Sequence, residues 1–209
     1  MKLYQIQNSA PCRKVRAVAA ELGIALELVD IDPGAGEQRT PEYMRKNPNA
    51  KVPLLVDGDF NLWESHAIMI YLANQKPEAG LLPSDARKQA DVLRWLFWQS
   101  CHLGAATGKM AFEKIYKIRR GGTFDQATFD EALNEFKRWA AVLDQALGGR
   151  DTICENLSLA DFSLAASFSG REVLGLDLSE YPHIKHWLNK IETRESWAKS
   201  APLVLAAKA

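Results

Sequence analysis

The sequence has few cysteines and no long apolar run. Its three cysteines, Cys12, Cys101 and Cys154, are odd in number and far apart, which argues against a disulfide framework and favours a reducing compartment. No apolar run approaches the roughly 20 residues that span a bilayer, and the first residues lack the basic and apolar pattern of a signal peptide. We therefore expect a cytoplasmic protein with no membrane partner.

An excess of charge of one sign is also missing. The 209 residues include 26 basic and 26 acidic side chains, so the formal net charge is zero, and no block of like charges is present. This balance gives no reason to expect nucleic acid or a membrane surface as a partner. The four histidines are scattered, and the two that lie one helical turn apart, His183 and His186, have no set of cysteines or carboxylates nearby. We expect no bound metal.

Strand and helix signals are present and divide the chain in two. Hydrophobic residues make up 47% of the sequence, enough for one large domain or two small ones. Within residues 1–77, the pattern of apolar residues, turns and helix caps predicts the order β-α-β-α-β-β-α, with a hairpin at Asp57-Gly58. Residues 78–86, which contain Gly80 and Pro83, form the predicted linker.

The second part, residues 87–209, has almost no strand signal. One long helix is expected from Ala86 to about Phe112, and a second ends at Gly148-Gly149. Ser158 and Asp161 are spaced as a capping-box variant, which starts a buried helix, and Tyr181-Pro182 begins a further helix. The fold class is therefore an α/β domain followed by an all-helical domain.

The most informative motif lies where the first strand meets the first helix. Ser9-Ala10-Pro11-Cys12 puts a hydroxyl and a thiol at a helix N-terminus, three residues apart. Unpaired N–H groups and the helix dipole favour negative charge there, and Pro11 suits the first helical position. The spacing resembles the thioredoxin Cys-x-x-Cys turn with serine in place of the first cysteine. Such a site stabilises a thiolate, whether the thiolate belongs to the protein or to a bound ligand.

Two further motifs complete a family resemblance. Lys51-Val52-Pro53 precedes the hairpin and Glu64-Ser65 follows it. Together with the motif at residues 9–12, they resemble a soluble glutathione transferase, bacterial and of the theta/zeta-like serine type, and the resemblance covers essentially the whole chain. It implies a thioredoxin-like first domain, a cytoplasmic homodimer, and glutathione as a co-substrate.

The resemblance also implies roles for individual residues. Ser9 would stabilise the glutathione thiolate by hydrogen bonding, and Cys12 is a lesser candidate for thiol chemistry. The bond between Val52 and Pro53 would be cis, which turns the Val52 backbone toward the cysteinyl part of glutathione. The γ-glutamyl end would be held by Glu64 and Ser65, the latter at a helix N-terminus.

The remaining positions are assigned in outline. Lys51 and Gln38, with Arg39 as a rival, match family positions near the glycine carboxylate of glutathione. A pocket for a small hydrophobic electrophile would lie beyond Ser9, and its candidate residues are Ala10, Trp98, His102, Phe112 and Tyr116. Three alternatives stay open: a glutathione-dependent isomerase or dehalogenase, a thiol-disulfide reductase using Cys12, and a non-catalytic binding or regulatory module.

Overall fold

The computed structural model describes residues 1–202, and these residues form two compact units. The first unit comprises Met1–Ala79 together with the described residues from Arg194 onward, and the second comprises Gly80–Thr193. The boundary after Ala79 falls inside the stretch expected as a linker. The expected helical domain differs at its end, because residues 194–202 belong to the first unit, where Arg194 and Ser196 contact Glu21 of helix α1.

The first unit is built on a four-stranded sheet. β1 (Lys2–Gln5) pairs in parallel with β2 (Glu27–Asp30) and antiparallel with β3 (Leu54–Asp57), which forms a hairpin with β4 (Phe60–Trp63). The resulting order is β2-β1-β3-β4. The structure thus confirms the α/β arrangement and the hairpin predicted from the sequence.

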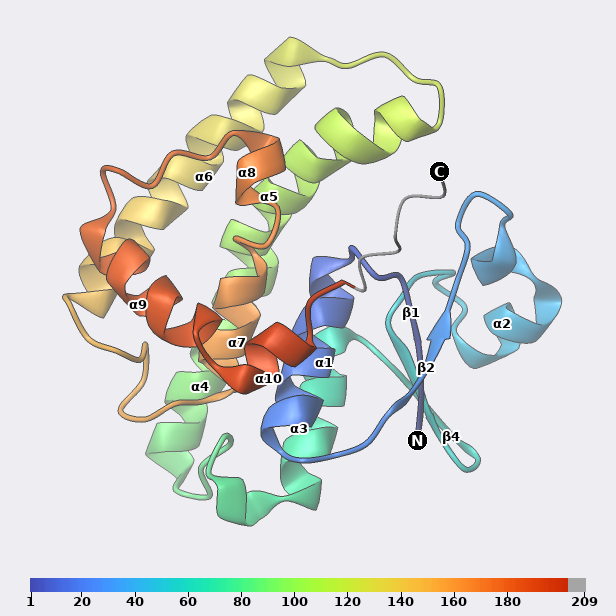
Figure 1. Cartoon of the computed structure of the whole chain (residues 1–209), viewed down its shortest axis with the longest axis horizontal. Helices are drawn as coiled ribbons and strands as arrows, with labels where there is room; N and C mark the ends of the chain where they lie inside the picture. Colours follow the sequence, from blue (N-terminus) through green and yellow to red (C-terminus); the bar gives the residue numbers. More distant parts are fainter. Residues whose placement is uncertain (203–209) are drawn as a thin grey trace. The chain divides into compact units, whose positions relative to one another are not determined.

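Helices cover both faces of this sheet (Figure 1). α1 (Ala10–Glu21) and α3 (Ser65–Gln75) pack against each other on one face, and α2 (Pro41–Lys46) lies on the other. Short 3₁₀ turns, η1 (Glu37–Arg39) and η2 (Pro77–Ala79), connect these elements, and α10 (Glu195–Lys199) packs on α1. The core between sheet and helices holds fully buried aliphatic side chains, among them Leu3, Val15, Leu55 and Ile68.

All secondary-structure elements described in the second unit are helices. Its elements are α4 (Ala86–Trp98), η3 (Gln99–Leu103), α5 (Gly104–Ala111), η4 (Phe112–Lys117), α6 (Gln126–Leu147), α7 (Leu159–Ala166), α8 (Arg171–Leu174) and α9 (Pro182–Glu192). Large aromatic side chains fill its core, including Phe136, Phe162, Phe168 and Trp187. The capping box expected at Ser158 is present at the start of α7.

The long helix expected to end near Phe112 continues to Lys117 and contains two π-helical segments, η3 and η4. At the first of them, a Cβ on Gly104 would come within 2.7 Å of the Gln99 carbonyl oxygen, so only glycine fits this close approach. The buried Gln99 side chain donates a hydrogen bond to the Ser167 hydroxyl at 2.9 Å. The sequence analysis predicted one continuous helix and did not anticipate these π segments, in which the hydrogen bonds span five residues instead of four.

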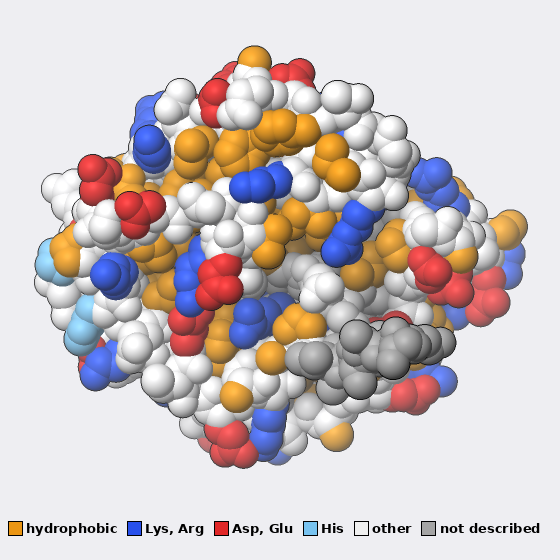
Figure 2. Space-filling model, turned by 45° about the horizontal axis from the view of Figure 1, so that its top comes forward, with side chains coloured by type: hydrophobic (Ala, Val, Ile, Leu, Met, Phe, Trp, Pro, Cys, Tyr) orange, Lys and Arg blue, Asp and Glu red, His pale blue; other side chains and the backbone are white. Residues whose placement is uncertain are grey.

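The surface carries mixed charge. On the face drawn in Figure 2, acidic and basic side chains are interspersed rather than gathered by sign. None of the helices between Met1 and Pro202 combines the length and apolar character that a bilayer crossing needs. Within the same described part of the chain, no three His, Cys, Asp or Glu side chains form a group suited to a metal ion.

Candidate active site

The strand register brings the sequence motifs of the first unit to one edge of the sheet. Tyr4 of β1 lies opposite Leu54 of β3, which lies opposite Trp63 of β4. Ser9 follows the end of β1, Pro53 comes directly before β3, and Glu64 comes directly after β4. Because β3 runs antiparallel to both neighbours, its beginning meets their ends. Motifs that are separated by more than 40 residues in sequence therefore lie at the same edge.

Ser9 is the N-cap of α1. Its backbone is extended (φ −82°, ψ 119°), and its Oγ accepts a hydrogen bond from the Cys12 N–H at 3.4 Å. The side chain is largely buried, with 8% of the residue exposed. A hydroxyl that accepts through a lone pair can still donate its hydrogen to a negatively charged atom. At a helix N-terminus, where negative charge is favoured, this hydroxyl is suited to hold a thiolate.

Cys12 is fully buried on α1. Burial raises the pKa of its thiol above the usual value, and the lowering effects of the Ser9 hydroxyl, the Ile6 backbone and the Arg16 charge only partly offset this. A buried thiol with a raised pKa is a poor nucleophile near neutral pH. The structure therefore favours a packing role for Cys12 over the redox role left open from the sequence.

The loop before β3 presents backbone groups. The peptide bond between Val52 and Pro53 is cis, as predicted. The preceding carbonyl, that of Lys51, is held by the Tyr43 hydroxyl at 2.6 Å and the Asn47 side-chain amide at 2.8 Å. Among residues 1–202, no hydrogen bond engages the Val52 N–H or carbonyl. These groups can pair with an extended peptide ligand as a neighbouring strand would.

Glu64 has an unusual backbone conformation. Its φ is +71° and its ψ is 114°, outside the regions that non-glycine residues normally adopt. Such conformations cost about 1–3 kcal/mol and cluster at ligand sites. Glu64 is exposed and is the N-cap of α3, and Ser65, at the first position of that helix, is 8% exposed. The pair thus combines a carboxylate, which can accept from an ammonium group, with a helix N-terminus, which attracts a carboxylate.

The three candidates for the glycine end of glutathione differ in environment. Gln38 is 8% exposed, and its Oε1 is buried without a hydrogen-bond partner among the described residues. Lys51 and Arg39 are exposed. Because the amide oxygen and nitrogen of glutamine can exchange places by rotation, Gln38 can present either an acceptor or a donor. Because its buried amide oxygen has no hydrogen-bond partner among the described residues, Gln38 is a better candidate than Arg39 for the glycine end of glutathione.

Sequence reasoning missed a buried pair beside Glu64. The Lys14 Nζ of α1 lies 2.7 Å from the His66 Nε2 of α3. Lys14 is only 4% exposed, and this burial lowers its pKa to about 7 although the nearby Glu64 charge acts to raise it. A lysine among the apolar residues of α1 was the available signal, but its partner is 52 residues away.

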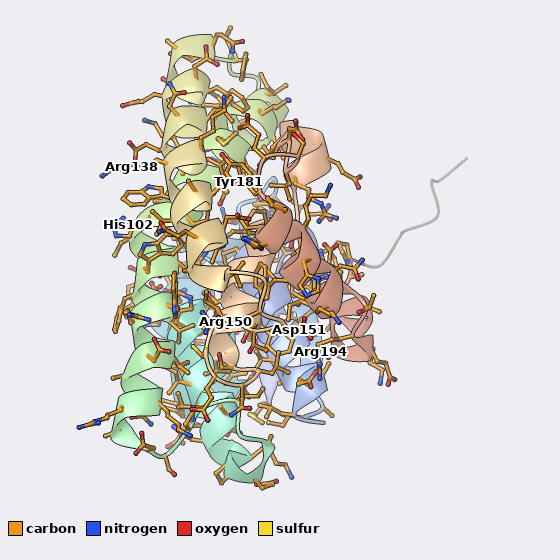
Figure 3. The ribbon with its side chains drawn as sticks, turned by 90° about the vertical axis from the view of Figure 1, so that its left-hand side faces the viewer. His102, Arg138, Arg150, Asp151, Tyr181 and Arg194 are labelled. Atoms are coloured by element: carbon orange, nitrogen blue, oxygen red, sulfur yellow. The ribbon has the colours of Figure 1, made fainter. Side chains whose placement is uncertain are left out.

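In the second unit, two candidates for the electrophile pocket belong to an aromatic cluster. His102 of η3 packs on Trp139 of α6 with ring centroids 4.3 Å apart, and Trp98 meets both rings edge-on at 5.8 and 6.1 Å. Figure 3 shows His102 near Arg138, whose guanidinium lies 4.4 Å from the Trp139 ring centroid. These contacts give Trp98 and His102 a packing role within the unit.

The other two candidates of the second unit, Phe112 and Tyr116, lie on η4. Phe112 is 45% exposed and Tyr116 is half-buried. Ala10 of the first unit is half-buried at the first position of α1, directly after Ser9. The structure therefore places Ala10 beside Ser9, while the four residues of the second unit are placed only within that unit.

Fold and site together define a class of protein: a thioredoxin-like unit with serine at the start of α1, a cis-proline loop and a Glu-Ser pair, followed by a helical unit. Family models agree with this description. The "Glutathione S-transferase, N-terminal domain" model matches residues 1–74, and the "Glutathione S-transferase, C-terminal domain" model matches residues 96–195. The chain belongs to the glutathione S-transferase family.

Individual relatives cover nearly the full chain. Glutathione S-transferase D7 of Drosophila melanogaster is 32% identical over 205 residues, which cover 96% of this chain and 88% of the relative. The structure of a glutathione S-transferase-I bound with lactoylglutathione is similar with a TM-score of 0.86 and 30% identity, over 96% of this chain and 97% of that one. A delta-class glutathione transferase of Nilaparvata lugens gives a TM-score of 0.84 and 31% identity, over 96% and 92%.

Proposed function

We propose that this protein is a glutathione transferase that joins the thiolate of reduced glutathione to small hydrophobic electrophiles. The observation that carries the proposal is the convergence of three features at one sheet edge: the Ser9 hydroxyl, the Val52 backbone, which has no hydrogen-bond partner among residues 1–202, and the strained Glu64 before Ser65. Their chemistry matches the thiol, the cysteinyl peptide and the γ-glutamyl end of glutathione. The lactoylglutathione bound to one of the similar structures supports this ligand class.

In the reaction, the glutathione sulfur forms a bond to an electrophilic carbon. In a substitution, the electron pair of the broken bond leaves with the displaced group; in an addition, the π electron pair moves onto a neighbouring acceptor atom of the electrophile. Ser9 lowers the thiol pKa by donating to the sulfur. A free thiol has a pKa of about 8.5, and a hydrogen bond to a charged group contributes roughly 1.5–3 kcal/mol, or about one to two pKa units. Glu64 would accept from the glutathione amine, Ser65 and the α3 N-terminus would hold its carboxylate, and Gln38 and Lys51 would hold the glycine carboxylate.

We further propose the assembly and setting of the enzyme. By family resemblance it would be a cytoplasmic homodimer, with residues 1–77 binding glutathione and the helical domain supplying the electrophile pocket, including Phe112 and Tyr116. The expected bacterial origin and theta/zeta-like class have weaker support, because two of the relatives described above are insect proteins and one is of the delta class. The proposal that a serine hydroxyl stabilises the thiolate depends on Ser9 and not on the class assignment.

A direct test is the ultraviolet difference spectrum of glutathione bound to the protein, followed from pH 5 to 9. A thiolate band that titrates below the pKa of free glutathione is expected. S-Methylglutathione, which occupies the same site without an ionisable thiol, serves as the control and should give no band. Saturable binding without a thiolate band at any pH up to 8 would contradict the transferase assignment and favour a ligand-holding module.

A further inference from the structure

The C-terminal segment 194–200 belongs to the unit that carries Ser9. Its helix α10 packs along α1 (Figure 1), and polar contacts tie the two helices together at both ends. Near the end of α1, Glu21 pairs with Arg194, labelled in Figure 3, and accepts from the Ser196 hydroxyl. Near the start of α1, Arg13 donates to the Ser200 hydroxyl at 3.4 Å.

The central contact is made by Arg16 of α1, which is only 6% exposed. Its Nη2 donates to the carbonyl of Gln7 at 3.0 Å and to the carbonyl of Ser200 at 2.8 Å, and its Nε also reaches Ser200, at 3.2 Å. Its Nη1 donates to the Gln5 side chain. The planar guanidinium thus joins three segments: the end of β1, the turn after it and the C-terminal segment.

The turn held by Arg16 is the one that carries Ser9. Gln7 is two residues before Ser9, and the Ser9 N–H closes the turn by donating to the Ile6 carbonyl at 3.0 Å. On the other side, the Gln5 and Gln7 side chains both donate to the Asp30 carboxylate at the end of β2. The direction of the Ser9 hydroxyl therefore depends on a turn whose carbonyl is fixed by Arg16.

We infer that Arg16, held by the C-terminal segment, is a positioning residue for the thiolate-stabilising serine. The inference rests on the proposed function. A hydrogen bond to sulfur depends on donor direction, so a turn free to shift would weaken the Ser9 contact and leave the bound thiol less acidic. The C-terminal segment would then contribute to glutathione activation without touching glutathione.

The test compares the pKa of enzyme-bound glutathione thiol in full-length wild type, Arg16→Gln and Arg16→Lys. In Arg16→Gln we expect a rise of about half to one pKa unit, equal to a three- to tenfold loss of thiolate below the pKa. Arg16→Lys retains the charge and the buried stem, so it should fold even if Arg16→Gln does not. Since a single ammonium cannot reproduce the guanidinium fork, it should recover only part of the shift.

Arg194→Ala is the matched control, because it breaks contacts of the same two helices away from the serine turn. It should lower the melting temperature and leave the thiol pKa at the wild-type value. An unchanged thiol pKa in both Arg16 variants would overturn the inference, and so would full recovery by Arg16→Lys, which would mean that charge alone acts. If wild type itself shows no thiolate band, the proposed function fails, and this outcome is distinct from both.

Discussion

Two serine-capped helix starts in this protein differ in how their polar groups are hydrogen-bonded. At the start of α7, Ser158 and the fully buried Asp161 form a closed network in which Asp161 accepts from the Ser158 and Ile153 N–H groups at 2.9 and 2.8 Å and from the Trp187 indole at 2.9 Å. At the start of α1, Ser9 accepts one long bond of 3.4 Å. It lies at the same edge of the sheet as Val52, whose backbone groups have no hydrogen-bond partner among residues 1–202.

The difference teaches how to distinguish a structural cap from a ligand site. Both begin with the same sequence signal, a serine before an apolar helix. In the α7 cap both carboxylate oxygens of Asp161 accept hydrogen bonds from within the unit. In the α1 cap, polar groups stay available at a helix N-terminus, which costs stability and leaves binding capacity for a ligand.

Replacing Asp161 should damage stability most. Asp161→Ala leaves the Ile153 N–H and the Trp187 indole N–H buried without partners, each at a cost of roughly 1–3 kcal/mol, and removes the cap as well. We expect a loss of about 3–5 kcal/mol in the free energy of unfolding, measured by urea denaturation at pH 7. Asp151→Ala is the control, since Asp151 is exposed and its ion pairs lie at the surface, where a pair contributes about 0–1 kcal/mol. Equal losses in the two variants would contradict a closed, buried network at α7.

Lys14 lies near Glu64, and its burial should lower the free energy of unfolding. Its pKa is about 7 in the folded protein and 10.5 as the reference value for the unfolded chain, so between these pH values the unfolded state binds more protons. The stability of the wild type should therefore rise with pH from about 7 to 10.5 on account of this residue. The cost of burying Lys14 is absent above pH 10.5, where the lysine is neutral in both states, and it approaches its full size as the pH falls toward 7.

Lys14→Met should consequently raise the free energy of unfolding at pH 7, by on the order of 2–4 kcal/mol less the lost contact with His66. The gain over wild type should shrink as the pH rises to 10. Urea unfolding at pH 6, 7, 8, 9 and 10 measures this dependence. A difference between variant and wild type that stays constant over this range would contradict a lowered lysine pKa. Lys88→Met, at an exposed surface ion pair, provides the comparison expected to show no such trend.

Ser9→Ala should damage chemistry rather than stability. Losing a hydrogen bond to the thiolate should raise the pKa of the bound glutathione thiol by about one to two units and reduce kcat/KM at pH 6.5 by about 10- to 100-fold. The loss of unfolding free energy should stay near 1 kcal/mol, the usual cost of an N-cap. Ser158→Ala should give the opposite result, a comparable or larger loss of stability with an unchanged thiol pKa. Conjugation activity retained in full by Ser9→Ala would remove Ser9 from the catalytic site.

Short motifs at the ends of secondary-structure elements were enough to predict which residues come together, while their roles toward a ligand stay predictions. Ser9, Val52-Pro53 and Glu64-Ser65 were all predicted as ligand-facing residues, and the strand register then brings them to one edge. The cis bond at Pro53 was predicted from its motif and confirmed. Such features are local, because caps, turns and strand ends depend on a few neighbouring residues.

Long-range contacts were not predictable in the same way. Arg16 meets Ser200 across 184 residues, and Lys14 meets His66 across 52, so neither charge could be assigned a partner from its place on α1. For the same reason, the sequence did not predict that residues 194–200 pack with the first unit, because their contacts are with residues far away in the sequence. Trp98 and His102 stay predictions as pocket residues, and their ring contacts with Trp139 show that aromatic spacing alone does not distinguish packing from binding.

The smallest effect is expected from thiol modification, which identifies the reactive group at the α1 terminus. Cys12 is fully buried and its thiol pKa is raised by burial, and burial raises the pKa of Cys154 to about 12, whereas Cys101 is exposed. Brief treatment of the native protein with iodoacetamide, followed by peptide mapping, should label Cys101 first and leave Cys12 and Cys154 almost unmodified. Conjugation activity should change by less than about twofold, because Ser9 acts on the ligand's thiol and needs no protein thiolate. Cys101→Ser, treated in parallel, should take up almost no label. If Cys12 were alkylated as fast as Cys101 with loss of activity, the reactive thiolate at this helix start would belong to the protein rather than to glutathione.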